Sequence, residues 1–362
     1  MKLIIQPGDG VERLLKGIRK AKKSVEIVIF RFDRPEIEQA LVDAVERGLF
    51  VHALIAFTNR GGEEILRKLE MRFLENGITV ARTAGDLVRY HGKMMIVDRK
   101  ELFLLAFNFT RMDIEHSRSF GFVTRNNKLV AEAVRLFEAD TKRQDYTAAS
   151  PRFLVSPVNA RKELAAFIKG AKRELRIYDP KISDRGMLRL LEERKNAGVE
   201  IRVIGKINSK RFAACELERL RLHTRSIIRD GSYAFIGSQS LRQLELDARR
   251  EIGVIFRDSA AVKELMRVFE EDWAASSKEL EQPKAQKVPL KKAVKKTTKA
   301  ITGKIPLDPV AQKMAKALRR KAKVDVEEKQ IKQSVKEVVK ELVEDAARSA
   351  AKEAVKVVAE PT

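Results

Sequence analysis

The chain has little of several residue types, and each shortage narrows what it can be. Cysteine occurs once in 362 residues, at Cys215, which excludes a disulfide framework and a cysteine-based zinc site and fits a reducing cytoplasm. No apolar run reaches the roughly 18 residues that a membrane span needs. Aromatic residues make up 6%, which offers little for stacking on nucleic-acid bases. Any contact with lipid is therefore expected from the aqueous side.

Positive charge, in contrast, is abundant. The net charge is +23, and such a balance suggests a polyanionic partner, either nucleic acid or an anionic membrane surface, although it also serves solubility. No aromatic residue follows Trp273, and residues 284–323 hold 14 Lys or Arg against the single acid Asp308. This composition predicts a disordered Lys-rich linker over residues 277–323 that contacts polyanions.

The last segment, residues 324–362, has a different pattern. Apolar residues recur there at helical spacing, at Ile331, Val335, Val339, Leu342 and Ala346. We expect an amphipathic helical tail whose apolar stripe serves packing or self-association.

The remaining body, residues 1–276, repeats itself in sequence. GVERLLKGIRKAKKSVEIVIFRF and ARKELAAFIKGAKRELRIYD each predict a helix followed by a strand, and each is followed by another helix and strand. Such alternation indicates α/β sheets that are covered on both faces. One constant offset of 132 positions relates the C-terminal parts of the two copies. It pairs His91 with His223, Asp98 with Asp230, Gly121 with Gly253, Phe137 with Phe269, and Asp140 with Asp272.

The paired histidines belong to two related motifs, HGKMMIVD and HTRSIIRD. Each motif opens a predicted β-hairpin, in which the residue two positions after the histidine points to the same side. An imidazole and a fixed cation that face one spot suit a phosphate, because the cation binds non-bridging oxygens while the imidazole attacks phosphorus or protonates a leaving oxygen. The cations neutralise the developing charge, so we expect neither a metal nor another cofactor.

These motifs resemble the phospholipase D superfamily, whose signature is a usually duplicated H-x-K-x-x-x-x-D followed by G-S-x-N. HGKMMIVD matches the first part fully, whereas LAFNFT matches the second part only at Asn108. The second copy has Arg225 for lysine and Ser240 for asparagine. The acid that family members often carry further on is Glu251 in the second copy, and Ser119 stands there in the first. Ala106, Ser119, Arg225 and Ser240 are thus the departures whose effect on activity the sequence leaves open.

The resemblance covers roughly residues 1–276 and implies a fold. It implies an α/β protein of two tandem phospholipase D-like α/β/α units, with mixed sheets packed about a pseudo-twofold axis. The first unit would span residues 1–148 and the second residues 149–276, with the linker and helical tail described above behind them.

The resemblance also implies a two-step reaction at one site between the repeats. His91 would attack the phosphodiester and form a phosphohistidine, because its copy is the better preserved, and His223 would act as general acid and base. The other site residues would bind or orient the phosphate, or close each motif at the far end of its strand: Lys93, Arg225, Asn108, Ser238, Ser240, Glu251, Asp98 and Asp230. Which imidazole Glu251 orients stays open, and Asp98 and Asp230 are expected to brace the fold more than to take part in chemistry.

Three candidate functions are compatible with the sequence. The first is a phosphodiesterase that acts on nucleic acid, as a hydrolase or as a transferase. The Lys-rich tail slightly favours this substrate. The second is a phospholipid-specific phospholipase D or a phosphatidyltransferase of the cardiolipin synthase type, which the same tail would hold on anionic lipid. The third is a catalytically weak architectural DNA-binding protein. We expect a cytoplasmic protein, associated with the nucleoid or with a membrane surface.

Several other residues have a structural interpretation. We expect Asp140 and Asp272, on helices, to cap or pair rather than to act in chemistry, His52 to be a strand residue, and His116 to be exposed. Cys215 is predicted to lie buried on a helix.

Overall fold

The computed structural model describes residues 1–58, 63–83, 85, 87–217 and 219–281, with side chains up to Ser276. The first half alternates helices and strands in the predicted order. Its elements are β1 (Lys2–Gln6), α1 (Glu12–Lys20), β2 (Ser24–Ile29), α2 (Pro35–Glu46), β3 (Phe50–Ile55), α3 (Glu64–Glu75), β4 (Thr79–Arg82), β5 (Arg89–Tyr90), β6 (Met94–Val97), β7 (Glu101–Leu105), α4 (Arg111–Glu115), β8 (Ser117–Thr124) and α5 (Asn127–Lys142).

The second half follows a similar order. Its elements are β9 (Phe153–Val155), α6 (Ala160–Lys169), β10 (Glu174–Ile182), α7 (Arg185–Asn196), β11 (Glu200–Ile207), β12 (Ala213–Cys215), β13 (Arg221–Leu222), β14 (Arg225–Arg229), β15 (Tyr233–Gly237), α8 (Gln243–Asp247), β16 (Arg249–Arg250), β17 (Ile252–Phe256) and α9 (Ser259–Glu281). All four helix–strand segments predicted from the sequence are present, and so are the hairpins β6–β7 and β14–β15.

Two large mixed sheets carry the fold. The first has the order β1-β8-β7-β6-β2-β3-β4, and the second has the order β9-β17-β15-β14-β10-β11-β12. In each, the three strands at one end run parallel, and the hairpin strands run antiparallel beside them. The predicted mixed α/β fold class is therefore confirmed, and the two strand orders correspond position by position.

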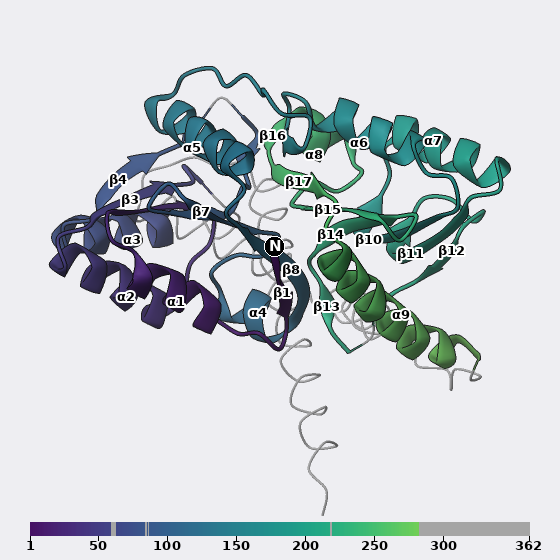
Figure 1. Ribbon diagram of the computed structural model, residues 1–362, viewed down its shortest axis with the longest axis horizontal. Helices are drawn as coiled ribbons and strands as arrows, with labels where there is room; N and C mark the ends of the chain where they lie inside the picture. The colour runs from purple at the N-terminus through teal and green to yellow at the C-terminus, as the bar shows by residue number, and fades with distance from the viewer. Residues whose placement is uncertain (59–62, 84, 86, 218, 282–362) are drawn as a thin grey trace, which may run out of the picture. The chain divides into compact units, whose positions relative to one another are not determined.

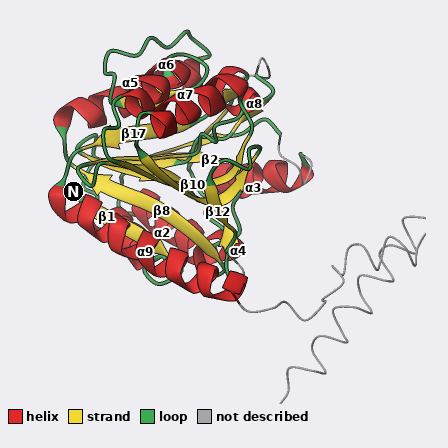
Figure 2. Cartoon of the chain, turned by 90° about the vertical axis from the view of Figure 1, so that its right-hand side faces the viewer, coloured by secondary structure: helices red, strands yellow, loops and turns green. Residues whose placement is uncertain are grey.

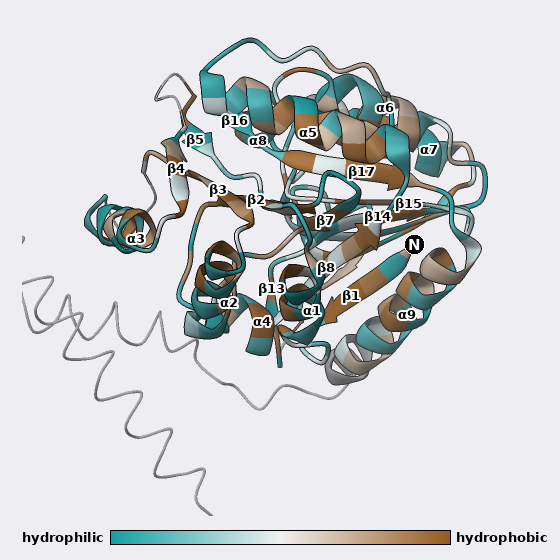
Figure 3. Cartoon of the chain, turned by 60° about the vertical axis from the view of Figure 1, so that its left-hand side comes forward, coloured by the Kyte–Doolittle hydropathy of each residue, from teal (hydrophilic) through white to brown (hydrophobic). Residues whose placement is uncertain are grey.

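The helices cover both faces of these sheets. Figures 1 and 2 show α5, α6 and α7 on one side of the strands and α2 and α9 on the other, and Figure 1 shows α1 beside α2. Figure 3 shows hydrophobic strands between helices whose outer surfaces are hydrophilic. In α1, for example, Leu14, Leu15 and Ile18 are buried, while the acidic and basic ends of the helix face water.

The two halves share one core. Phe122 of β8 stacks on Phe256 of β17 with ring centroids 5.8 Å apart, and Phe120 meets Tyr178 of β10 edge-on at 5.3 Å. The hydrophobic cluster around them contains residues from both halves. Residues Met1–Glu281 accordingly form one compact unit.

Two short strand pairs join the halves and position the site. β13 pairs in parallel with β8, and β16 pairs in parallel with β5. The partners are related by the sequence offset, because Arg89 and Arg221 are 132 positions apart, as are Ser117 and Arg249. Each histidine follows directly on one of these strands, so each lies against a strand of the other half.

One prediction about local structure is wrong. Cys215 lies not on a helix but at the end of β12, where it is buried. Ala, Glu and Leu around it favour a helix, but β11 offers a backbone edge with which this segment pairs in parallel. Helix α9 continues past residue 276 to Glu281. The rest of the predicted linker and the helical tail lie outside the described residues.

Among residues 1–281, leaving aside the gaps, none of the helices combines the length and apolarity that crossing a bilayer requires.

Candidate active site

His91 is fixed by residues of the other half of the chain. It lies between β5 and β6, and its backbone N–H donates to the carbonyl of Arg250 over 2.7 Å. Its Nδ1 atom lies 2.8 Å from Oε2 of Glu251, and both side chains are buried. A carboxylate accepts hydrogen bonds only, so Nδ1 carries the proton and donates it. The Nε2 atom is left with its lone pair available, and Glu251 orients His91 rather than His223.

His223 has the reciprocal arrangement. It follows β13, and its backbone N–H donates to the carbonyl of Arg118 over 3.1 Å. Its Nδ1 atom lies 3.3 Å from Oδ2 of Asp113 and 3.5 Å from Oγ of Ser119. The same argument assigns the Nδ1 proton and leaves Nε2 unprotonated in the neutral ring.

Asp113 was not among the residues predicted from the sequence. It lies on the five-residue helix α4, where Thr110 caps the N-terminus. Glu245 occupies the corresponding place on α8, and the two acids are 132 positions apart. The backbone N–H of Asn108 donates to Asp113 over 2.7 Å, and that of Ser240 donates to Glu245 over 2.8 Å. The shared offset is the signal that identifies both acids.

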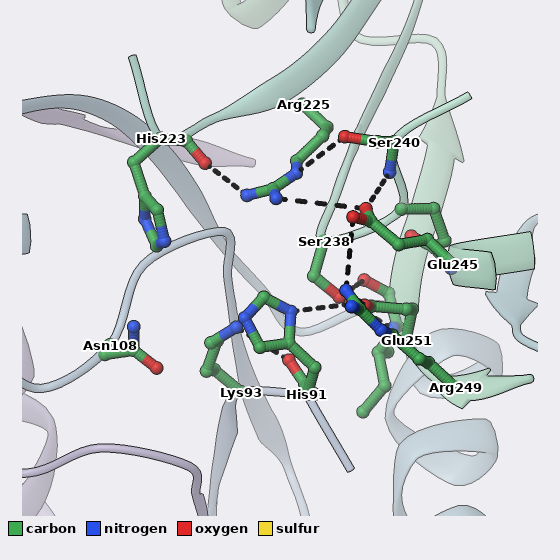
Figure 4. A network of polar contacts seen from close by, with 12 residues as sticks. His91, Lys93, Asn108, His223, Arg225, Ser238, Ser240, Glu245, Arg249 and Glu251 are labelled. Atoms are coloured by element: carbon green, nitrogen blue, oxygen red, sulfur yellow. Dashed lines mark hydrogen bonds and ion pairs between the residues drawn. The ribbon is translucent and has the colours of Figure 1, made fainter. Parts of the chain in front are cut away.

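Lys93 and Arg225 bring positive charge between the histidines. Nζ of Lys93 donates to the carbonyl oxygen of His91 over 2.7 Å, and a guanidinium N–H of Arg225 donates to that of His223 over 2.6 Å. Both cations are buried. Figure 4 shows His91, Lys93 and Asn108 with His223 and Arg225 around one space.

The predicted polar ligands lie in the same cluster, each with its own partner. Nδ2 of Asn108 donates to Asp113 over 2.6 Å, and Oγ of Ser240 accepts from Arg225 over 3.2 Å. The Ser238 hydroxyl accepts from the backbone N–H of Ile252 over 3.1 Å, next to Glu251 (Figure 4). Ser240 thus reaches the site through Arg225.

Arg249 was also missed, and it completes the charge balance. It lies 3.2 Å from Glu245 and 4.0 Å from Glu251. Arg225 lies 3.8 Å from the same Glu245. The second half therefore contributes two arginines and two glutamates, and the carboxylates hold the cations in place.

With no phosphate bound, the electrostatics of the site favour the neutral form of both imidazoles. Burial lowers the pKa of His91 well below its usual value, and the charges of Lys93 and Arg225 lower it further. Burial and the same two cations lower the pKa of His223 in the same way. Burial also raises the pKa of Glu251. It lowers the pKa of Lys93 to about 7, so this lysine loses its proton far more easily than an exposed one.

Asp98 and Asp230 lie at the far ends of their strands and bond to the backbone. The Asp98 carboxylate accepts from the backbone N–H groups of residues 22, 23 and 24 over 2.7–3.1 Å. Asp230 accepts from residues 172, 173 and 174 over the same range. Both aspartates adopt the left-handed conformation, with φ of 54° and 53°. Their contacts brace the start of β2 and β10.

The other polar residues named from the sequence lie elsewhere. Asp140 bonds to Arg250 at 2.9 Å and Asp272 to Arg118 at 2.7 Å, so each pairs with the other half. His52 lies on β3, and His116 is exposed behind α4. Among the described residues, no group of three or more His, Cys, Asp or Glu side chains is placed to hold a metal ion.

Known proteins resemble part of this chain in sequence. The family model described as "Cardiolipin synthase, PLD-like domain" matches residues 14–141, and the mitochondrial cardiolipin hydrolase of Danio rerio is 27% identical over 131 residues, 35% of this chain and 56% of that protein. These matches support the phospholipase D superfamily. Its match to the curated relatives spans between 50% and 58% of their length. Of the two site histidines, His91 lies inside the matched range.

Solved structures extend the likeness of the fold to both halves of the chain. The polyphosphate kinase of Porphyromonas gingivalis superposes with a TM-score of 0.63 at 20% identity, over 75% of this chain and 50% of that one. The phosphatidylserine synthase of Haemophilus influenzae Rd KW20 superposes with a TM-score of 0.61 at 10% identity, over 82% of this chain and 93% of that one. At these identities the likeness concerns the fold alone.

Proposed function

We propose that this chain is a phosphodiesterase that cleaves or transfers a phosphodiester through a phosphohistidine intermediate. One observation carries the proposal. Two buried imidazoles are each held through Nδ1 by a carboxylate, with Lys93 and Arg225 between them. Neutral imidazoles with an available Nε2 can attack phosphorus or take up a proton, and the two cations suit the phosphate oxygens.

In the first step, Nε2 of His91 attacks phosphorus and forms the P–N bond. Glu251 accepts the Nδ1 proton of His91 in a hydrogen bond and so stabilises the positive charge that develops on the ring. The bond from phosphorus to the leaving oxygen breaks, and that oxygen takes a proton from Nε2 of His223. His223 enters this step as the imidazolium, because the negative charge of the bound phosphodiester favours the charged ring. Lys93, Arg225 and Asn108 hold the non-bridging oxygens, with Ser240 supporting Arg225 and Ser238 beside Glu251.

In the second step, His223 removes a proton from water or from an alcohol, and the oxygen attacks phosphorus. The P–N bond to His91 breaks, and the reaction leaves both rings as they began. Water gives hydrolysis, while an alcohol gives transfer of the phosphoryl group.

The site belongs to two repeats in this proposal. We assign residues 1–148 to the first phospholipase D-like unit and residues 149–276 to the second, related by a pseudo-twofold axis. The matching strand orders and the reciprocal pairs β13–β8 and β16–β5 support this assignment. Either repeat alone would lack the acid or the histidine that the other supplies.

The substrate is a phospholipid or a nucleic acid, and different observations favour each. Phospholipid is favoured by the family model and by the cardiolipin hydrolase relatives, through their descriptions. Nucleic acid is favoured by the net charge of +23 and by the Lys-rich segment, because phosphate contacts dominate nucleic-acid affinity. A protein that only binds DNA would have no need for two oriented histidines.

Turnover of bis-p-nitrophenyl phosphate in EDTA tests the chemistry. We expect the wild-type chain to turn over, and His91→Ala and His223→Ala to lose at least about 1,000-fold in kcat. His116→Ala is the matched control, since His116 is exposed and outside the cluster. Wild type and both site variants with equal activity would overturn the proposal.

The same preparations separate the substrates. Phosphatidylglycerol vesicles and single-stranded or double-stranded DNA are offered at equal phosphate concentration, with and without residues 282–362. A nuclease cleaves DNA, and loses affinity but not kcat when the basic segment is removed. A lipid enzyme instead releases the headgroup or transfers the phosphatidyl group. Binding of DNA without turnover of any substrate would support the architectural alternative.

A further inference from the structure

We propose that Asp113 is the positioning residue of His223 and replaces the acid that is missing at Ser119. The inference rests on the proposed phosphodiesterase function, and it names a residue that the motifs do not contain. Ser119 and Glu251 are 132 positions apart, so in the sequence Ser119 stands where a partner for His223 would be expected. The serine hydroxyl lies 3.5 Å from Nδ1 of His223, whereas the Asp113 carboxylate lies 3.3 Å away and carries the charge.

Asp113 is held rigidly for this role. The side chain is 5% exposed, and both the backbone N–H and Nδ2 of Asn108 donate to its Oδ2 atom, over 2.7 Å and 2.6 Å. Arg221, from the other half, donates to its Oδ1 atom. A single carboxylate therefore orients a phosphate ligand, Asn108, and an acid–base group, His223.

Each of the two carboxylates lies among cations. Oε2 of Glu251 lies 2.8 Å from Nδ1 of His91, and Lys93, Arg225 and Arg249 all act on the charge of Glu251. Both oxygens of Asp113 are engaged, Oδ2 by Asn108 and Oδ1 by Arg221. Asp113 thus matches Glu251 as a charged partner of a buried imidazole.

Several charged groups face His223 and set its protonation together. Arg225 follows on β14, Lys93 and His91 approach from the first half, and Arg221 lies on β13. These groups disfavour the imidazolium, while Asp113 on α4 favours it. Removing the charge of Asp113 should therefore lower the pH at which His223 loses its proton.

Asp113→Asn tests the assignment, because it keeps the shape of the side chain and removes the charge. The readout is the ratio of kcat values for diphenyl phosphate and bis-p-nitrophenyl phosphate. Phenol is the poorer leaving group and needs protonation more. We expect about a 100-fold loss on diphenyl phosphate and about a 10-fold loss on bis-p-nitrophenyl phosphate. The basic limb of the pH profile of kcat should move to lower pH.

Two further variants keep the test decisive. Asp113→Asn combined with Ser119→Glu should recover most of the diphenyl phosphate activity, because it restores a carboxylate at the position equivalent to Glu251. Arg221→Gln should move the basic limb to higher pH, opposite to Asp113→Asn, and it decides the question if Asp113→Asn does not fold. The control is Glu115→Gln, an exposed acid on the same helix, for which neither readout should change.

Equal losses on the two substrates, or no opposite shift with Arg221→Gln, would overturn the role of Asp113. Both of these results count against Asp113 only when the wild type is active and the histidine variants are inactive. A wild type without histidine-dependent turnover instead removes the proposed function, and this inference with it.

Discussion

The Nδ1 atom of His91 lies 2.8 Å from Oε2 of Glu251, a residue 160 positions further along the chain. The contact joins the two halves, and its counterpart, His223 with Asp113, joins them in the other direction. Each imidazole is therefore oriented by the half to which it does not belong. A site built in this way requires that the halves pack in one defined arrangement.

Glu251→Gln should lower kcat by about 100-fold while leaving KM nearly unchanged, because the amide cannot stabilise the imidazolium that forms on His91. The measurement is turnover of bis-p-nitrophenyl phosphate, together with rapid quenching at high pH, where the P–N bond of the phosphohistidine survives. The trapped intermediate should decrease with kcat. Glu216→Gln, whose side chain is 62% exposed in its pair with Lys206, is the matched control. A variant with wild-type kcat would show that Glu251 has no part in orienting the nucleophile.

Asp98→Ala should cost stability rather than catalysis. Burial opposes ionisation of this carboxyl, but the backbone N–H groups of residues 22–24 outweigh it and lower its pKa. Their loss should reduce the free energy of unfolding by about 2 kcal/mol in urea titrations at pH 7. This contribution is fully present above the pKa that Asp98 has in the unfolded chain, and it is lost as the pH falls through the lowered pKa of the folded chain. The free energies of unfolding of variant and wild type should therefore converge in acid. A large fall in kcat of the folded variant would instead place Asp98 in the chemistry.

Local patterns predicted much of this structure. The four helix–strand segments follow from helical and alternating periodicity, and their strands are interior strands in the parallel part of each sheet. The two histidines and two cations follow from a motif whose spacing is local, and the structure brings all four together (Figure 4).

The missed parts depend on contacts between distant segments. Asp113 and Glu245 lie on helices of five residues, too short for a periodic signal, and their partners are found only in the folded chain. The helical interpretation of Cys215 failed for the same reason, because pairing with β11 outweighed local propensity. The sequence also could not predict which histidine Glu251 orients, because this depends on the pairing of β16 with β5.

Lys93 predicts an unusual pH dependence of stability. Burial lowers the pKa of Lys93 to about 7 in the folded chain, against an ordinary value of 10.5. Between these values the unfolded chain holds a proton that the folded chain lacks, so this group makes the free energy of unfolding rise with pH. The rise is at most about 1.4 kcal/mol per pH unit. Lys93→Met should lack this rise. When the free energy of unfolding is measured in urea from pH 7 to pH 9, it should therefore increase more for wild type than for the variant. Parallel curves would show that Lys93 stays protonated in the fold.

The ion pair of Arg118 with Asp272 should hold the two halves together. Two guanidinium N–H groups donate to the carboxylate over 2.7 Å and 2.8 Å, and Tyr178 donates to it over 2.7 Å. Both charged side chains are at most 15% exposed.

Arg118→Met leaves a buried carboxylate without its cation, so it should reduce the free energy of unfolding by about 3 kcal/mol in urea. Arg125→Met, whose arginine pairs with Glu101 at the surface and is 76% exposed, should cost less than about 0.5 kcal/mol. The backbone carbonyl of Arg118 also accepts a hydrogen bond from the backbone N–H of His223, and the substitution keeps this carbonyl. We therefore expect kcat to fall only if the loosened interface displaces His223. Equal stabilities of the two variants would show that the pair contributes nothing to the union of the halves.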